Sequence, residues 1–122
     1  ISPLVLERES AMSVSSPFHI GPPTRVLVAG GRGLVGSAVV RELDRRGVTH
    51  IDAPPSSTLN LLRREDVFSY LRDHTPDVVI DAAARVGGIY ANNTYPAEFL
   101  SQNLQIQVNL MDAAAQVGVD RF

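Results

Sequence analysis

The segment Gly30-Gly31-Arg32-Gly33-Leu34-Val35-Gly36-Ser37 places a glycine at every third position, in the pattern G-x-x-G-x-x-G. A glycine triplet alone is a weak signal. Here it follows the short apolar run from Arg25 to Ala29 and precedes a segment with helical spacing of apolar residues. A glycine loop between a buried strand and a helix is the context in which such a loop binds a dinucleotide.

Each glycine of the loop has a chemical reason. Gly30 allows a tight turn out of the strand, Gly33 removes a Cβ so that the backbone can approach a pyrophosphate, and Gly36 lets the helix pack closely on the sheet. The free N–H groups at the start of the helix then favour the diphosphate charge. The loop therefore predicts cofactor contacts at Gly30, Gly31, Arg32, Gly33, Leu34, Val35 and Gly36.

Two alternatives compete with this interpretation. A P-loop requires Gly-Lys-Ser/Thr, but Ser37 directly follows Gly36 and all eleven basic residues of the chain are arginines. The other alternative is that the glycines serve only a tight turn. The strand–loop–helix context favours nucleotide binding over both.

The rest of the chain alternates between strand and helix patterns. Apolar spacing predicts helices over 34–46, 63–74 and 96–117, the last with an apolar stripe at Leu100, Leu104, Val108, Met111 and Ala115. Short apolar runs predict strands over 48–52 and 77–81, with residues 119–122 approaching a further strand. This order predicts the α/β class: a Rossmann-like, doubly wound parallel sheet, truncated after its first β-α-β-α-β-α portion.

Composition limits the function classes. We expect residues 1–23, rich in Ser and Pro, to be a disordered leader, and residues 24–122 to form the N-terminal part of an incomplete dinucleotide-binding domain. A net charge of −2 with mixed signs argues against nucleic acid or a membrane surface as partner. The chain has no cysteine, and its three histidines have no ligand spacing, so we expect no metal. The cytoplasm is the default location.

Other positions near the loop bear on the cofactor. Asn60 can hydrogen-bond adenine, although capping of the next helix is an equal alternative. The small residues Ala82, Ala83 and Ala84 let a ribose and phosphate lie against the backbone, or simply pack at a strand end.

Asp52 lies roughly where an acid would bind the ribose 2′-hydroxyl of NAD, whereas Arg32 favours the 2′-phosphate of NADP. The choice between NADP and NAD stays open on these residues.

The segment from Arg85 to Phe99, RVGGIYANNTYPAEF, is more distinctive. It resembles the GDP-L-fucose synthase family of the extended short-chain dehydrogenase/reductase superfamily, and the similarity runs from about Arg25 to Phe122. It also covers the glycine loop, the Leu59–Leu62 stretch, the alanine triplet, and Gln102-Asn103 through Asn109. The loop is specific to that enzyme type, whereas the glycine motif is shared across the superfamily.

The resemblance implies NADPH as reductant and GDP-4-keto-6-deoxy-mannose as substrate, epimerised at C3 and C5 before hydride delivery to C4. It assigns cofactor contacts to Ser56, Asn60 and Leu61 as well as to the glycines and alanines, and a substrate-side loop to Val86, Gly87 and Gly88. Asn109 matches a helix position that shapes the active site; the alternative is a surface amide. Pro54 and Ser56 stand where the family often has arginines for the 2′-phosphate, which leaves Arg32 as the main support for NADP.

The resemblance also implies where the chemistry lies. The family's catalytic Ser and its Tyr-x-x-x-Lys motif fall beyond Phe122, and a chain without lysine cannot contain that motif. We therefore expect a fragment that binds cofactor, is inactive alone and, when full length, forms a homodimer through its long helices. Another nucleotide-sugar epimerase, reductase or dehydratase, or a non-catalytic dinucleotide sensor, stays open as an alternative.

Overall fold

The computed structural model describes residues 19–84 and 96–122. The elements, in chain order, are β1 (Arg25–Ala29), α2 (Leu34–Arg45), β2 (His50–Asp52), α3 (Arg64–His74), β3 (Val78–Asp81) and α5 (Pro96–Val117). The predicted leader falls almost wholly outside the described residues, and so do Val86, Gly87 and Gly88 of the predicted substrate-side loop.

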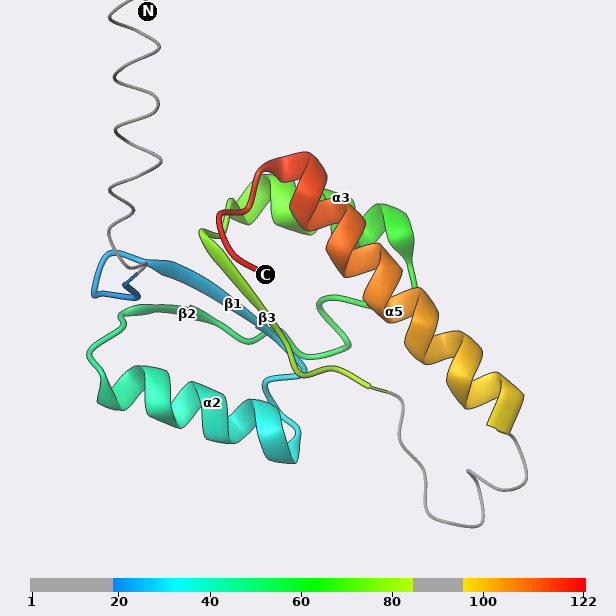
Figure 1. The fold of residues 1–122 in the computed structure, drawn as a ribbon, viewed down its shortest axis with the longest axis horizontal. Helices are drawn as coiled ribbons and strands as arrows, with labels where there is room; N and C mark the ends of the chain where they lie inside the picture. The colour runs from blue at the N-terminus through cyan, green and yellow to red at the C-terminus, as the bar shows by residue number, and fades with distance from the viewer. Residues whose placement is uncertain (1–18, 85–95) are drawn as a thin grey trace, which may run out of the picture.

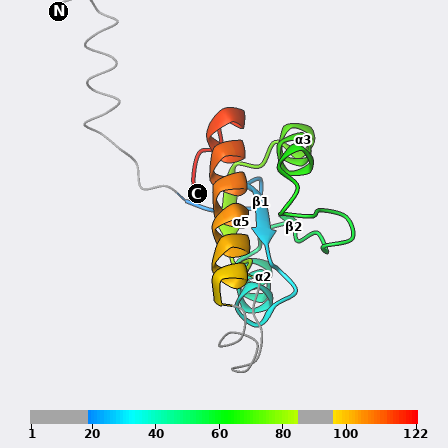
Figure 2. The same ribbon diagram turned by 90° about the vertical axis from the view of Figure 1, so that its right-hand side faces the viewer.

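The three strands form one parallel sheet in the order β2-β1-β3. Figure 1 shows α2 on one side of this sheet and α3 with α5 on the other, and in Figure 1 and the turned view of Figure 2 α5 runs along the direction of the strands. Because β1 is covered on both faces, residues 26–29 are all buried. Val26 and Val28 pack toward α2, and Leu27 and Ala29 pack toward α3 and α5. This confirms the predicted fold class.

The predicted helices occur, with boundaries within one or two residues. Gly47 follows α2 with a φ of 84°, as its predicted role as a stop requires. The second strand is shorter than predicted, because the Val48 amide donates to the Leu43 carbonyl at the end of α2 instead of entering the sheet. The Val48 side chain joins the core beneath α2.

Helix α5 has two apolar faces, and sequence periodicity identified the exposed one. In the predicted stripe, Leu100, Leu104, Val108 and Met111 are 45–61% exposed. The face that packs on the sheet and on α3 consists of Ile106, Asn109, Leu110, Ala113 and Ala114. Only Ile106 and Leu110 of this face are large apolar residues, and the other three are two alanines and an amide, so the exposed stripe gave the stronger signal in the sequence.

The segment after α5 begins to pair with the sheet. Gly118, with a φ of 82°, ends the helix, and Arg121 then makes an isolated parallel bridge with Val78 of β3. The Val79 amide donates to the Arg121 carbonyl over 2.9 Å. The predicted approach to a further strand therefore lies beside β3. In the described ranges, no helix combines the length and the apolar character that crossing a bilayer requires.

Candidate dinucleotide site

A cavity of about 530 Å³ lies at the carboxyl ends of the three strands. Its walls come from the glycine turn after β1, the loop after β2 and the alanines after β3. In open parallel sheets, ligands bind in the crevice outside these ends. The lining residues are Ala29, Gly30, Gly31, Arg32, Gly33, Pro54, Pro55, Ser56, Leu59, Asn60, Leu61, Leu62, Ala82, Ala83, Ala84 and Ile106.

The glycine turn is tight because Gly30, Gly31 and Gly36 have no room for a side chain. Gly30 has a φ of 74°, and a Cβ there would lie 2.6 Å from the Ala82 carbonyl oxygen. A Cβ on Gly36 would collide with the Gly30 carbonyl and lie 2.8 Å from the Gly31 Cα. The Gly33 amide closes the turn by donating to the Gly30 carbonyl over 3.0 Å.

The start of α2 is open toward an anion. Gly33 is the N-cap residue and provides no side-chain cap, and the first turn contains no acid. The amides of Leu34, Val35 and Gly36 therefore have no carbonyl partner within the helix, whereas the Ser37 amide donates to the Gly33 carbonyl over 2.9 Å. Among the described lining residues, Arg32 carries the only formal charge, and it is positive. Open amides, the helix dipole and one guanidinium together suit a phosphate.

Three predicted contact residues do not line the cavity. The side chains of Leu34 and Val35 are 90% and 65% exposed, and Gly36 is buried under the turn. Their position at the start of α2 leaves them only backbone amides to offer a ligand. The remaining predicted positions in the described residues all line the cavity: Gly30, Gly31, Arg32, Gly33, Ser56, Asn60, Leu61, Ala82, Ala83 and Ala84.

The loop after β2 is held from two sides. The Asn60 Oδ1 accepts a hydrogen bond from the Leu62 amide over 3.1 Å, which is an Asx turn ahead of α3. The N-cap of α3 is Arg63, so the capping alternative for Asn60 is wrong, and the residue lines the cavity. Asn109 of α5 is 7% exposed and donates through Nδ2 to the Leu61 carbonyl over 2.8 Å. The alternative that Asn109 is a surface amide is therefore wrong, because its side chain is buried and hydrogen-bonded to a residue of the cavity wall.

Directly before the wall after β3 stands a residue that the sequence did not single out and that does not itself line the cavity. Asp81, the last residue of β3, accepts a hydrogen bond at Oδ1 from the Ala83 amide over 3.0 Å. Burial raises the pKa of the Asp81 carboxyl, and the Ala83 hydrogen bond partly opposes that shift. One acid within VVIDAAA was the available signal, but the apolar pattern of a buried strand concealed it.

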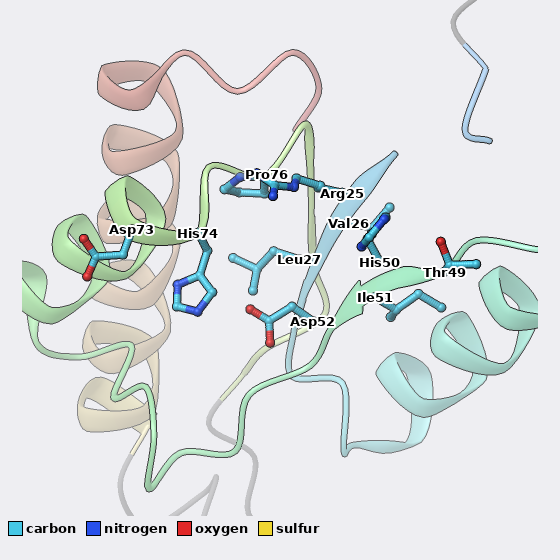
Figure 3. Close-up of a pocket in the computed structure, with 10 residues that line it drawn as sticks. All are labelled: Arg25, Val26, Leu27, Thr49, His50, Ile51, Asp52, Asp73, His74 and Pro76. Carbon is cyan, nitrogen blue, oxygen red and sulfur yellow. The ribbon is translucent and has the colours of Figure 1, made fainter. Parts of the chain in front are cut away.

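A second cavity, of about 420 Å³, lies elsewhere, and it is the one that Asp52 lines. Figure 3 shows the Asp52 side chain directed toward α3, on the side of His74. Its Oδ2 accepts a hydrogen bond from the Tyr70 hydroxyl over 2.7 Å, and the His74 ring stacks on Tyr70 with centroids 3.8 Å apart. Burial and this hydrogen bond raise the pKa of Tyr70.

The second cavity does not suit a dinucleotide as well as the first. It is lined by residues 25–27 of β1, by all of β2 and by the end of α3, and it contains no part of the glycine turn. Asp52 is hydrogen-bonded to Tyr70 and does not line the cavity beside the glycine turn. The one sequence position that favoured NAD therefore gives no support for it. Across the described ranges, no group of three His, Asp or Glu side chains is arranged to hold a metal ion.

Known proteins share sequence with this chain across the residues that form the cavity. The model of the NAD dependent epimerase/dehydratase family matches residues 26–122. Over 98 residues the chain is 50% identical to GDP-L-fucose synthase 1 of Arabidopsis thaliana and 45% identical to GDP-L-fucose synthase of Escherichia coli K12. In each case the match covers 80% of this chain but 30% of the relative.

A solved structure has the same fold. The GDP-mannoheptose C4 reductase MlghC from Campylobacter jejuni, determined with NADP bound, matches with a TM-score of 0.78 and 26% sequence identity. The match covers 83% of this chain and 30% of that one. The chain therefore spans about 30% of the length of the relatives that it matches.

Proposed function

Because the chain belongs to the NAD dependent epimerase/dehydratase family, we propose that it is the cofactor-binding part of an epimerase/reductase of the GDP-L-fucose synthase type. The observation that carries the proposal is the open, uncapped start of α2 at the base of the glycine-turn cavity. The names of the relatives at 45–50% identity support the enzyme type.

The residues present fit a dinucleotide phosphate. The bare turn at Gly30 and Gly33 lets the backbone approach the pyrophosphate, and the amides from Leu34 onward hydrogen-bond its oxygens. In this proposal Arg32 neutralises the 2′-phosphate of NADP, and Ser56, which lines the same cavity, is a hydroxyl partner for it. No acid lines the described part of this cavity, so the 2′-phosphate meets no like charge there.

NADPH, when bound, supplies the hydride for reduction of the 4-keto group. The part played by these 122 residues is to fix the cofactor: the glycine turn would hold its phosphates, and Leu61 and Ile106 give the cavity an apolar lining against which the adenosine would pack. The proposed substrate is GDP-4-keto-6-deoxy-mannose. The proposal places the Ser, Tyr and Lys that act on the sugar outside these residues, since no lysine occurs among them.

The test uses the polypeptide encoded by the complete gene. Titration with NADPH and NADH, followed by fluorescence, should show tighter binding of NADPH. Incubation of the protein with NADPH and a panel of GDP- and dTDP-linked 4-keto sugars should give GDP-L-fucose from the GDP-4-keto-6-deoxy-mannose arm. Turnover of a different sugar would assign a neighbouring enzyme, and binding without turnover of any sugar would favour a dinucleotide sensor.

We also propose a homodimer formed through the exposed face of α5. The exposed residues Leu100, Leu104, Val108 and Met111 run along this helix, and the first three of them line a shallow groove on it. A second copy can place the same stripe against this one about a two-fold axis. Sedimentation equilibrium of the complete protein tests this: a dimer is expected, and Leu104→Glu should convert it to monomer.

A further inference from the structure

The two carboxylate oxygens of Asp81 differ: one is hydrogen-bonded, and the other is buried without a partner in the described residues. Asp81 is the last residue of β3 and pairs with Ala29 of β1 in the register of the sheet. Its Oδ1 binds the Ala83 amide, whereas its Oδ2 is buried and has no hydrogen-bond partner among the described residues. Burying a carboxylate oxygen without a donor is unfavourable, so this residue type needs a compensating reason.

The hydrogen bond from the Ala83 amide to the carboxylate provides such a reason, because it stabilises the turn after β3. The Ala82 amide still donates to the Ala29 carbonyl, over 2.9 Å, so the sheet ladder extends to Ala82. The next amide, that of Ala83, points instead to Asp81 in an Asx turn. The carboxylate therefore sets the direction in which the backbone leaves the sheet after β3.

The same turn is the wall on which the glycine loop rests. A Cβ built on Gly30 would lie 2.7 Å from the Ala83 Cα, so the two backbones are in direct contact. Ala82, Ala83 and Ala84 also line the glycine-turn cavity, opposite the loop after β2. A shift of this turn would therefore displace both the cavity wall after β3 and the glycine loop that contacts it.

We propose that Asp81 is a positioning residue for the dinucleotide: its Oδ1, as acceptor from the Ala83 amide, orders the Ala82–Ala84 turn against Gly30. The proposal rests on the proposed function, because it names what keeps that cavity in shape. The role requires a hydrogen-bond acceptor at this position and not a negative charge, so an amide side chain should serve it equally well.

The experiment compares three variants of the complete protein by their NADPH dissociation constants. Asp81→Asn keeps the acceptor, and we expect its affinity to lie within about twofold of the unaltered protein. Asp81→Leu keeps the bulk and removes the acceptor, and we expect a loss of about fivefold or more, the loss of one hydrogen bond. The control Asp44→Leu removes an exposed acid from α2 and should leave NADPH affinity unchanged.

The outcomes separate the two proposals. Full NADPH binding by Asp81→Leu, or an equal loss in Asp81→Asn, overturns the role of the acceptor. If Asp81→Leu does not fold, Asp81→Ala takes its place; failure of both to fold while Asp81→Asn folds would make Asp81 a folding residue and also overturn the proposal. If the unaltered protein does not bind NADPH, the proposed function fails, and this inference fails with it.

Discussion

The Asn109 side chain of α5 donates a hydrogen bond from Nδ2 to the Leu61 carbonyl, 2.8 Å away and 48 residues earlier in the chain. This contact joins a helix that packs behind the sheet to a loop that lines the glycine-turn cavity. Leu110 and Ala113, its neighbours on the same helix face, are completely buried, so the amide is held in a rigid setting. The cavity wall therefore depends on a residue far from the glycine loop in sequence.

Replacing that amide should loosen the wall. We expect Asn109→Leu to lower the free energy of unfolding by about 1–3 kcal/mol, because the half-buried Leu61 carbonyl loses its donor. NADPH affinity should fall as well. Urea denaturation and NADPH titration measure the two effects, with the exposed Gln116→Ala on the same helix as control. Unchanged stability in Asn109→Leu would show that the contact contributes nothing.

Two glycines of the loop should respond differently to alanine. Gly36→Ala places a Cβ against the Gly30 carbonyl, so we expect destabilisation of about 1–3 kcal/mol and loss of NADPH binding. A Cβ on Gly33 would meet only the Gly30 carbonyl oxygen, at 3.4 Å, and the residue has an ordinary φ of −77°. Gly33→Ala should therefore keep its stability and lose only cofactor affinity. Thermal unfolding and titration of both variants separate these effects, and equal stability of the two variants would contradict the steric account.

The Tyr70–Asp52 pair should act on stability and not on cofactor choice. Tyr70→Phe removes the hydroxyl that donates to Asp52, and we expect a loss of about 1–2 kcal/mol. The ratio of NADPH to NADH affinity should stay unchanged, because Asp52 does not line the glycine-turn cavity. A change of that ratio in favour of NADH would contradict this prediction and show that Asp52 contacts the cofactor.

The same pair predicts an alkaline pH dependence. The folded-state pKa of Tyr70 is raised above the ordinary value of 10.0, so its stabilising contribution is complete below pH 10 and is lost as the pH rises further. The stability difference between the unaltered protein and Tyr70→Phe should therefore narrow above pH 10. Urea midpoints across this range measure it. A constant difference would contradict the raised pKa.

The 122-residue polypeptide by itself should be poorly stable or self-associating. The apolar stripe of α5 is exposed, and the outer edge of β3 pairs with little more than Arg121 in the described residues. Thermal unfolding combined with analytical ultracentrifugation tests this expectation. A sharp, cooperative transition in a dilute, verified monomer would refute it.

The sequence predicted the sheet, the glycine turn and most cavity residues because these follow from local rules. A covered strand is apolar throughout, and a turn with a positive φ at Gly30 requires glycine. What it missed depends on contacts between distant segments. The Asn109–Leu61 and Tyr70–Asp52 hydrogen bonds span 48 and 18 residues, and no periodicity encodes them. Asp52 illustrates the difference: its spacing suggested a ribose contact, but its strand register directs it toward α3.

The central claim is that the open amides at the start of α2 bind the cofactor diphosphate. Amide NMR of the complete protein during titration with NADPH tests it most directly. We predict that the amide signals of Leu34, Val35 and Gly36 shift in proportion to saturation, together with that of Gly33. Binding that leaves these four signals in place, or no binding up to millimolar NADPH, would contradict the claim.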